Sequence, residues 1–174
     1  MSNVINAFRG ALLSASLAVA VVPALPEVAA AAQEVNIVDG YAVHGYDVVA
    51  YFTEGKPVPG NDLFTAEYDG ATYRFASAAH RDAFTAAPAR YAPQYGGFCA
   101  FGTAMGRKFD GDPTAWAIVD DKLYLNLNAE VQSKWKQNVP GFLKGANNNW
   151  PIIRSVADAQ LEAAAPAGVT LGAQ

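Results

Sequence analysis

Cysteine is nearly missing from this 174-residue sequence, which has only Cys99. A single cysteine cannot form an intrachain disulfide, so the fold must be stable without a cross-link of that kind. The thiol is therefore buried, bound to a metal, reactive, or paired with another chain. The sequence leaves all four outcomes open.

Long hydrophobic runs are also missing, apart from one near the N-terminus. Arg9 precedes an apolar run from Ala11 to Val22, and a segment rich in Pro and Ala follows. This order is typical of a cleavable secretory signal, here residues 1–32, with cleavage expected among Ala29 to Ala32. The alternative is a membrane anchor, but the run has about a dozen residues and a membrane-spanning helix needs about 20. We therefore expect an exported chain, periplasmic or secreted, that is soluble and not stably inserted in a membrane after cleavage.

An excess of positive charge is absent, since 12 Lys and Arg face 16 Asp and Glu and the net charge is -4. This balance argues against nucleic acid or anionic lipid as a partner. The sequence also lacks the G-x-S-x-G, H-E-x-x-H, P-loop and G-x-G-x-x-G motifs. It therefore favours a binding protein over an enzyme, with thiol-dependent catalysis as the weaker alternative.

The clearest local pattern is a hairpin within residues 64–75, because its Asp69-Gly70 turn favours type I′ geometry. The predicted register pairs Tyr68 with Ala71, Glu67 with Thr72, Ala66 with Tyr73, Thr65 with Arg74, and Phe64 with Phe75. Ser77 then offers an N-cap for a helix that Pro88 ends.

A second hairpin is predicted after a loop from Phe101 to Pro113. Its Asp120-Asp121 turn is expected to pair Ile118 with Leu123 and Trp116 with Leu125. Residues 129–138 then read as a helix stopped by Pro140. The segment 141–153 is expected to add a further helical turn before its Pro151.

The order of these elements predicts the fold class. Hairpins followed by helices indicate an α+β fold, with small antiparallel hairpins packed with short helices in a single domain. We assign that domain to residues 33–153. Residues 154–174 are rich in Ala and have no aromatic ring, which predicts a mobile tail that is helical in part.

Three segments resemble the YHS domain family in its longer exported form: GYDVVAYF at 45–52, FTAEYDGATYRFASAAHRDAFTAAPARYAPQYGGFCAFG at 64–102, and GDPTAWAIVDDKLYLNLNAEVQSKWKQNVPG at 111–141. The resemblance implies a small α+β domain related to treble-clef-like metal-binding modules. The short metal-type modules carry cysteines where this chain has Ala50, Ala76 and His80. Only His80 keeps a side chain that can bind a metal at those positions.

A soft transition metal is the first ligand that these residues suggest. Cys99, His44, His80 and Met105 offer thiolate, imidazole and thioether donors, which suit copper, or zinc if the methionine takes no part. A copper-binding chain of this kind would sequester or deliver the ion. The alternative is that Cys99, which lies between Phe98 and Phe101, is a small buried core residue.

A non-metal recognition module is the second hypothesis. The chain has more large rings than a core of this size must bury, and Tyr and Trp suit contact surfaces for a flat ligand or a protein partner. The candidate ligand-binding residues are Tyr46, Asp47, Tyr51 and Tyr95. The sequence names no protein partner.

Overall fold

The computed structural model describes residues 33–163 of the chain. The predicted signal, residues 1–32, and the last part of the predicted tail, residues 164–174, lie outside the described residues. Between residues 33 and 163, none of the helices combines the length and the apolar character needed to cross a membrane. The described chain has the predicted mixture of small antiparallel sheets and short helices.

Short elements make up the whole described range. In chain order they are β1 (Ile37–Val38), β2 (Tyr41–Ala42), η1 (Val43–Gly45), α1 (Ala50–Thr53), β3 (Asn61–Tyr68), β4 (Ala71–Phe75), α2 (Ala78–Ala86), α3 (Pro88–Tyr91), η2 (Gln94–Gly97), α4 (Ala100–Ala104), β5 (Asp112–Val119), β6 (Lys122–Asn126), α5 (Ala129–Lys136), α6 (Val139–Ile153) and α7 (Asp158–Ala163). Within this range the strands pair as β1-β2, β3-β4 and β5-β6, all antiparallel.

Hairpin β3-β4 has the predicted turn, with φ of 52° at Asp69 and 76° at Gly70, as a type I′ turn requires. The confirmed pairs are Tyr68 with Ala71, Glu67 with Thr72, Ala66 with Tyr73, and Thr65 with Arg74. The predicted pairing of Phe64 with Phe75 is wrong, because a bulge places Asn61 opposite Phe75. A bulge changes the register without changing the turn, so the turn sequence does not predict it.

Hairpin β5-β6 also follows the predicted register. Ile118 pairs with Leu123 and Trp116 pairs with Leu125. The two turn residues, Asp120 and Asp121, have φ of 49° and 59°. Aspartate tolerates this left-handed conformation, so the pair forms the same kind of tight turn as Asp-Gly.

Helix α2 begins where the sequence predicts. The Ser77 hydroxyl accepts a hydrogen bond from the backbone N–H of His80 at 3.2 Å, and the helix ends at Ala86, before Pro88. Its buried residue, Phe84, packs on the hairpin, with its ring centroid 4.8 Å from that of Tyr73 and 5.0 Å from that of Phe75.

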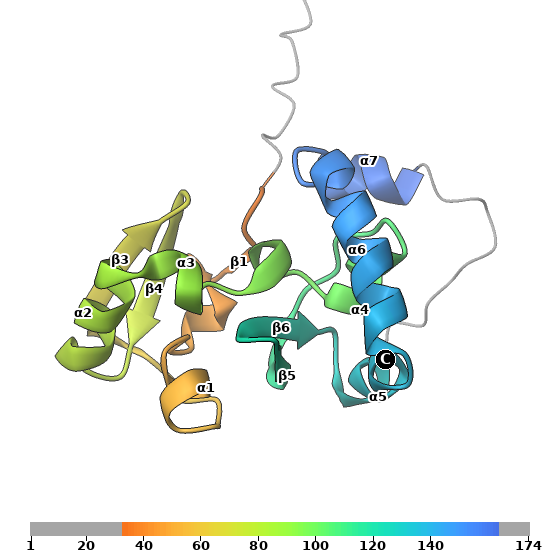
Figure 1. Ribbon diagram of the computed structural model, residues 1–174. Coiled ribbons are helices and arrows are strands. Elements are labelled where there is room, and N and C mark those ends of the chain that lie inside the picture. The colour runs from red at the N-terminus through yellow and green to blue at the C-terminus, as the bar shows by residue number, and fades with distance from the viewer. Residues whose placement is uncertain (1–32, 164–174) are drawn as a thin grey trace, which may run out of the picture.

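Two hydrophobic clusters divide the interior. The first is centred on β4 and α2, and the second joins Tyr95, Tyr124 and Trp135 to α4 and α6. Figure 1 shows β3, β4, α2 and α3 on one side of the molecule and α4 to α7 on the other, with β5-β6 between them. We call these two parts the hairpin side and the helical side.

Two of the predictions for the helical side are wrong. The expected loop from Phe101 to Pro113 begins with helix α4, because Cys99 caps it and its Sγ accepts the Gly102 N–H at 3.3 Å. The helix expected before Pro140 is α5, which ends at Lys136, but helix α6 runs from Val139 to Ile153 and continues past Pro151, before which only a helical turn was expected. Pro140 lies in the first turn, where no helical partner for its nitrogen is needed, and Pro151 lies in the last turn.

Lys108 joins the two ends of the described chain. Its side chain is 0% exposed, and Nζ donates to the carbonyl oxygens of Gln33 at 2.8 Å and Val156 at 2.9 Å. Nζ also pairs with Asp158 at 3.0 Å, at the start of α7. The described part of the predicted tail therefore contains helix α7, and Lys108 fastens the start of this helix to the domain.

Candidate functional site

Asp47 is the most enclosed charged group on the hairpin side, with a side chain that is 0% exposed. Oδ1 accepts from the backbone N–H groups of Val49 at 2.9 Å and Ala50 at 3.3 Å, and Oδ2 accepts from that of Ala76 at 2.8 Å. These bonds join the start of α1 to the end of β4. Burying a carboxylate is costly unless its oxygens accept hydrogen bonds, and these donors supply them.

His80 completes this arrangement. Its Nδ1 lies 2.6 Å from Asp47 Oδ2, and its side chain is 20% exposed. Because an ionised carboxylate can only accept, Nδ1 carries the proton of this hydrogen bond, and Nε2 is the ring nitrogen left for another partner. A carboxylate that orients a histidine in this way is common beside metal-binding imidazoles.

His44 has a similar but more exposed partner. Its Nε2 lies 2.8 Å from Asp110 Oδ1, and the same oxygen accepts from Asn36 Nδ2 at 2.5 Å. Both histidines of the chain are thus held by an aspartate, although they lie in different parts of the fold.

Cys99 is 0% exposed and caps the short helix α4. Burial raises the pKa of its thiol above the ordinary value, and the hydrogen bond from the Gly102 amide offsets only part of this effect. The residue also lines a cavity of about 220 Å³, with Phe101, Phe109 and Leu127 among its neighbours. The thiol is therefore neutral at physiological pH, and it is neither an activated nucleophile nor a ready thiolate ligand.

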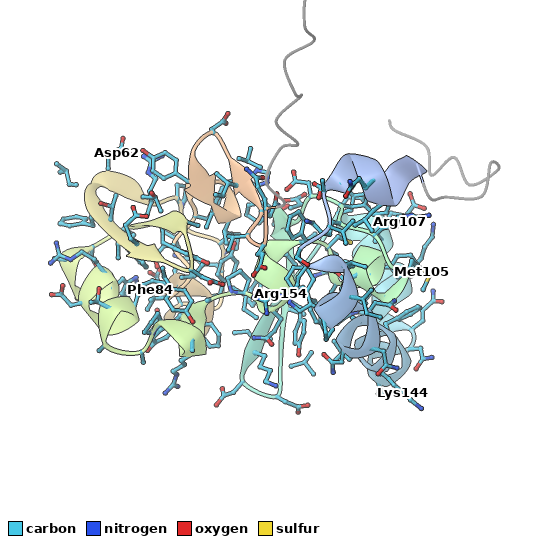
Figure 2. All side chains as sticks on the ribbon, turned by 90° about the horizontal axis from the view of Figure 1, so that it is seen from above. Asp62, Phe84, Met105, Arg107, Lys144 and Arg154 are labelled. Atoms are coloured by element: carbon cyan, nitrogen blue, oxygen red, sulfur yellow. The ribbon has the colours of Figure 1, made fainter. Side chains whose placement is uncertain are left out.

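The structure does not assemble the four predicted metal donors. Met105 is 52% exposed on the outer surface of the helical side, where Figure 2 labels it, while Cys99 is buried. Between residues 33 and 163, there is no group of three or more His, Cys, Asp or Glu side chains that could hold a metal ion. These residues do not fit a preformed thiolate metal site, and copper or zinc binding by His44, His80, Cys99 and Met105 stays a prediction.

The predicted ligand-binding residues lie in different surroundings. Tyr51 is buried and donates to the Pro113 carbonyl at 2.9 Å, and burial raises its pKa. Tyr46 is half-buried and forms a backbone bridge with Pro59, and Asp47 is occupied as described above. Of the four, only Tyr95 lines a cavity that lies between the hairpin side and the helical side.

This cavity, which we call the central cleft, has a volume of about 200 Å³. Tyr68 and Tyr73 from hairpin β3-β4 line one part of it, with ring centroids 6.5 Å apart. Tyr95 from η2 and Trp150 from α6 line another, with centroids 6.0 Å apart. Two aromatic pairs from distant parts of the sequence thus border one small space.

Hydrogen bonds hold the second aromatic pair in position. The Tyr95 hydroxyl donates to Asn147 Oδ1 at 2.9 Å, and Asn149 Nδ2 donates to the carbonyl oxygens of Thr103 at 3.1 Å and Ala104 at 3.0 Å. The asparagine run before Trp150 therefore fastens α6 to η2 and α4.

Charged groups from the two ends of the described chain also line the cleft. Arg154 Nε donates to Glu34 Oε2 at 3.0 Å, and Arg154 Nη2 donates to the same oxygen. This pair lowers the pKa of Glu34 and raises that of Arg154, and the nearby Asp69 carboxylate adds to the effect on Arg154. Figure 2 labels Arg154 near the middle of the molecule, between Phe84 on the hairpin side and Lys144 on the helical side.

Gly96 allows Glu34 to reach the cleft. Its φ is +60°, and a Cβ at this position would lie 2.0 Å from the Glu34 carbonyl oxygen. The Asn36 N–H donates to the Gly96 carbonyl at 2.8 Å and holds the two segments together. Gly96, three residues before Cys99, thus makes room for the N-terminal segment. Nothing in the local sequence points to Glu34 or Arg154 as site residues.

The comparisons with known proteins give one match. The family model of the YHS domain matches residues 49–95, so this segment of the chain is a YHS domain. Neither the curated proteins nor the solved structures include a match to the chain. Metal binding is ascribed to the YHS family, and the matched range contains His80 but ends before Cys99.

Proposed function

We propose that this chain is an exported binding protein of the YHS family that holds a small organic ligand in the central cleft. One observation carries the proposal: two aromatic pairs and three charged groups border a cavity of about 200 Å³ between the two sides of the fold. Concave sites with aromatic walls and a few polar groups are where proteins bind small molecules. Export rests on the leader pattern of residues 1–32, and the N-terminal mass of the secreted chain tests it.

The surroundings of Cys99 support a binding role without turnover. A catalytic cysteine needs a lowered pKa and access to substrate, whereas this thiol has a raised pKa and no exposed surface. We therefore assign it to the core, as the cap of α4.

The three tryptophans of the chain provide the test. Trp150 lines the cleft, Trp135 is 0% exposed in the helical core, and Trp116 packs on Tyr51 with centroids 5.0 Å apart. We would record the indole N–H signals of the ¹⁵N-labelled chain while adding benzamide, benzamidine or benzoate, each alone. A Trp150→Phe variant assigns its signal.

The proposal predicts that at least one probe moves the Trp150 signal in a saturable way and leaves the Trp135 signal in place. Equal shifts at Trp135 and Trp150 would indicate a general change in the fold. If none of the probes moves Trp150, the cleft is not a ligand site for small rings.

Metal binding through His80 is the second candidate, because Asp47 fixes the ring through Nδ1 and leaves Nε2 for another partner. A Cu(I) titration against a competing chelator, with Zn(II) in parallel, tests it on the wild type, His80→Gln and Cys99→Ala. Loss of binding only in His80→Gln supports this candidate. Loss only in Cys99→Ala would restore the thiol as the ligand and contradict its assignment to the core.

A further inference from the structure

We propose that the ligand of the central cleft is a small planar organic cation, such as a ring that bears an amidinium group. This inference rests on the proposed function and adds the charge and shape of the ligand.

The charges of the cleft sum to a negative value. Glu34 and Asp69 carry one negative charge each, and Arg154 carries the single positive charge of the lining residues. Lys108 also acts on Glu34, but it pairs with Asp158 at 3.0 Å and its Nζ donates to carbonyl oxygens. A cation entering the cleft therefore meets one uncompensated carboxylate.

The hydrogen bonds of Glu34 and Asp69 leave acceptor atoms for a ligand. Both N–H groups that Arg154 directs at Glu34 go to Oε2, and no hydrogen bond within residues 33–163 uses Oε1. The Asp69 carboxylate likewise takes part in no hydrogen bond or ion pair of the described chain, and its residue lies exposed at the tip of the hairpin. A forked N–H donor matches a carboxylate of this kind.

The aromatic pairs favour the same chemistry. The faces of Tyr and Trp rings attract cations, and the rings of the lining that keep exposed surface are those of Tyr68 and Trp150, since Tyr73 is 1% and Tyr95 6% exposed. A volume of about 200 Å³ matches one ring with a short polar group and is smaller than the pockets of drug-sized ligands, which are about 300 Å³ or larger.

Benzamidine, benzamide and benzoate have nearly the same shape and differ in charge, so they separate charge from fit. We expect benzamidine to move the Trp150 indole signal with an affinity about fivefold higher than that of benzamide, the ratio that one partly exposed ion pair provides. Benzoate should bind most weakly, since it meets Glu34 and Asp69.

Asp69→Asn removes one carboxylate and keeps the turn, because Asn tolerates the left-handed φ of 52° found there. Asp120→Asn is the matched control, since it makes the same change in the turn of the other hairpin, where φ is 49° and the residue does not line the cleft. The variant should lose most of the benzamidine preference, and the control should keep it.

The outcomes separate the two proposals. Equal affinities for all three probes, or a preference for benzoate, would overturn the cation proposal and leave the cleft as a ligand site. Loss of the preference in Asp120→Asn as well as in Asp69→Asn would show that it does not arise in the cleft. Failure of every probe to move Trp150 would overturn both proposals.

Discussion

Replacing Asp47 with alanine should destabilise the chain more than any change of an exposed aspartate. The substitution removes the acceptor of the Val49 and Ala76 N–H groups, while the Ala50 N–H keeps a bond to the Asp47 backbone carbonyl at 3.2 Å. An orphaned buried donor costs about 1–3 kcal/mol, which applies in full to the buried Val49 N–H and in part to the partly buried Ala76 N–H, and His80 loses its partner as well. We therefore expect a loss of about 3–5 kcal/mol in the free energy of unfolding.

Asp47→Asn separates charge from shape. Its oxygen can still accept from the Val49 N–H, but its amide nitrogen would face the Ala76 N–H, and two donors cannot bond. We expect an intermediate loss of about 1–3 kcal/mol. Glu67→Ala is the control, because it removes only an exposed bond from the Thr72 hydroxyl and should change stability by less than about 0.5 kcal/mol.

Urea unfolding followed by circular dichroism measures all three variants, with the free energy taken by linear extrapolation. The unfolding slope should stay constant, so that a change of midpoint reports stability. A loss below about 1 kcal/mol for Asp47→Ala would refute the reasoning, since it would mean that water or a neighbouring group satisfies the two donors.

Three further predictions concern the rest of the fold. Cys99, with no exposed surface, should react with N-ethylmaleimide only in denaturant, and rapid labelling of the native chain would contradict its burial. Burial raises the pKa values of Cys99, Tyr51 and Tyr73 above their ordinary 9.0 and 10.0, so the folded state holds these protons longer than the unfolded state. The free energy of unfolding should therefore be constant from pH 7 to about 9 and fall as the pH rises further, and urea curves that coincide at pH 7 and 10.5 would disprove this. Lys108→Met should speed hydrogen exchange in residues 156–163 relative to the wild type and leave that of β3-β4 unchanged. If exchange in residues 156–163 is also the same as in the wild type, Lys108 does not fasten α7.

The sequence predicts those parts of the fold that local chemistry determines. The Asp69-Gly70 turn and the Ser77 cap each act within a few residues, and the structure confirms both. The bulge in β3 and the start of α4 at Cys99 depend on packing and carry no comparable local pattern.

The candidate site depends on contacts between distant segments, which a single sequence does not show. Glu34, Asp69, Tyr95 and Trp150 come together only because Gly96 admits the N-terminal segment and α6 folds back over η2. Only Tyr95 was predicted to bind a ligand. The pairing of His80 with Asp47 likewise spans 33 residues, and it was not foreseen although both residues were candidates.

The position of a bound ligand tests the central claim most directly, because residues 33–163 line a cavity between the two sides and a further one beside Cys99. We would determine a crystal structure of the chain from residue 33 onward, grown with benzamidine. The account predicts a ring between the Tyr68 and Tyr73 pair and the Tyr95 and Trp150 pair, with its amidinium toward Glu34 or Asp69. A ring in the cavity beside Cys99, with the central cleft vacant, would contradict it.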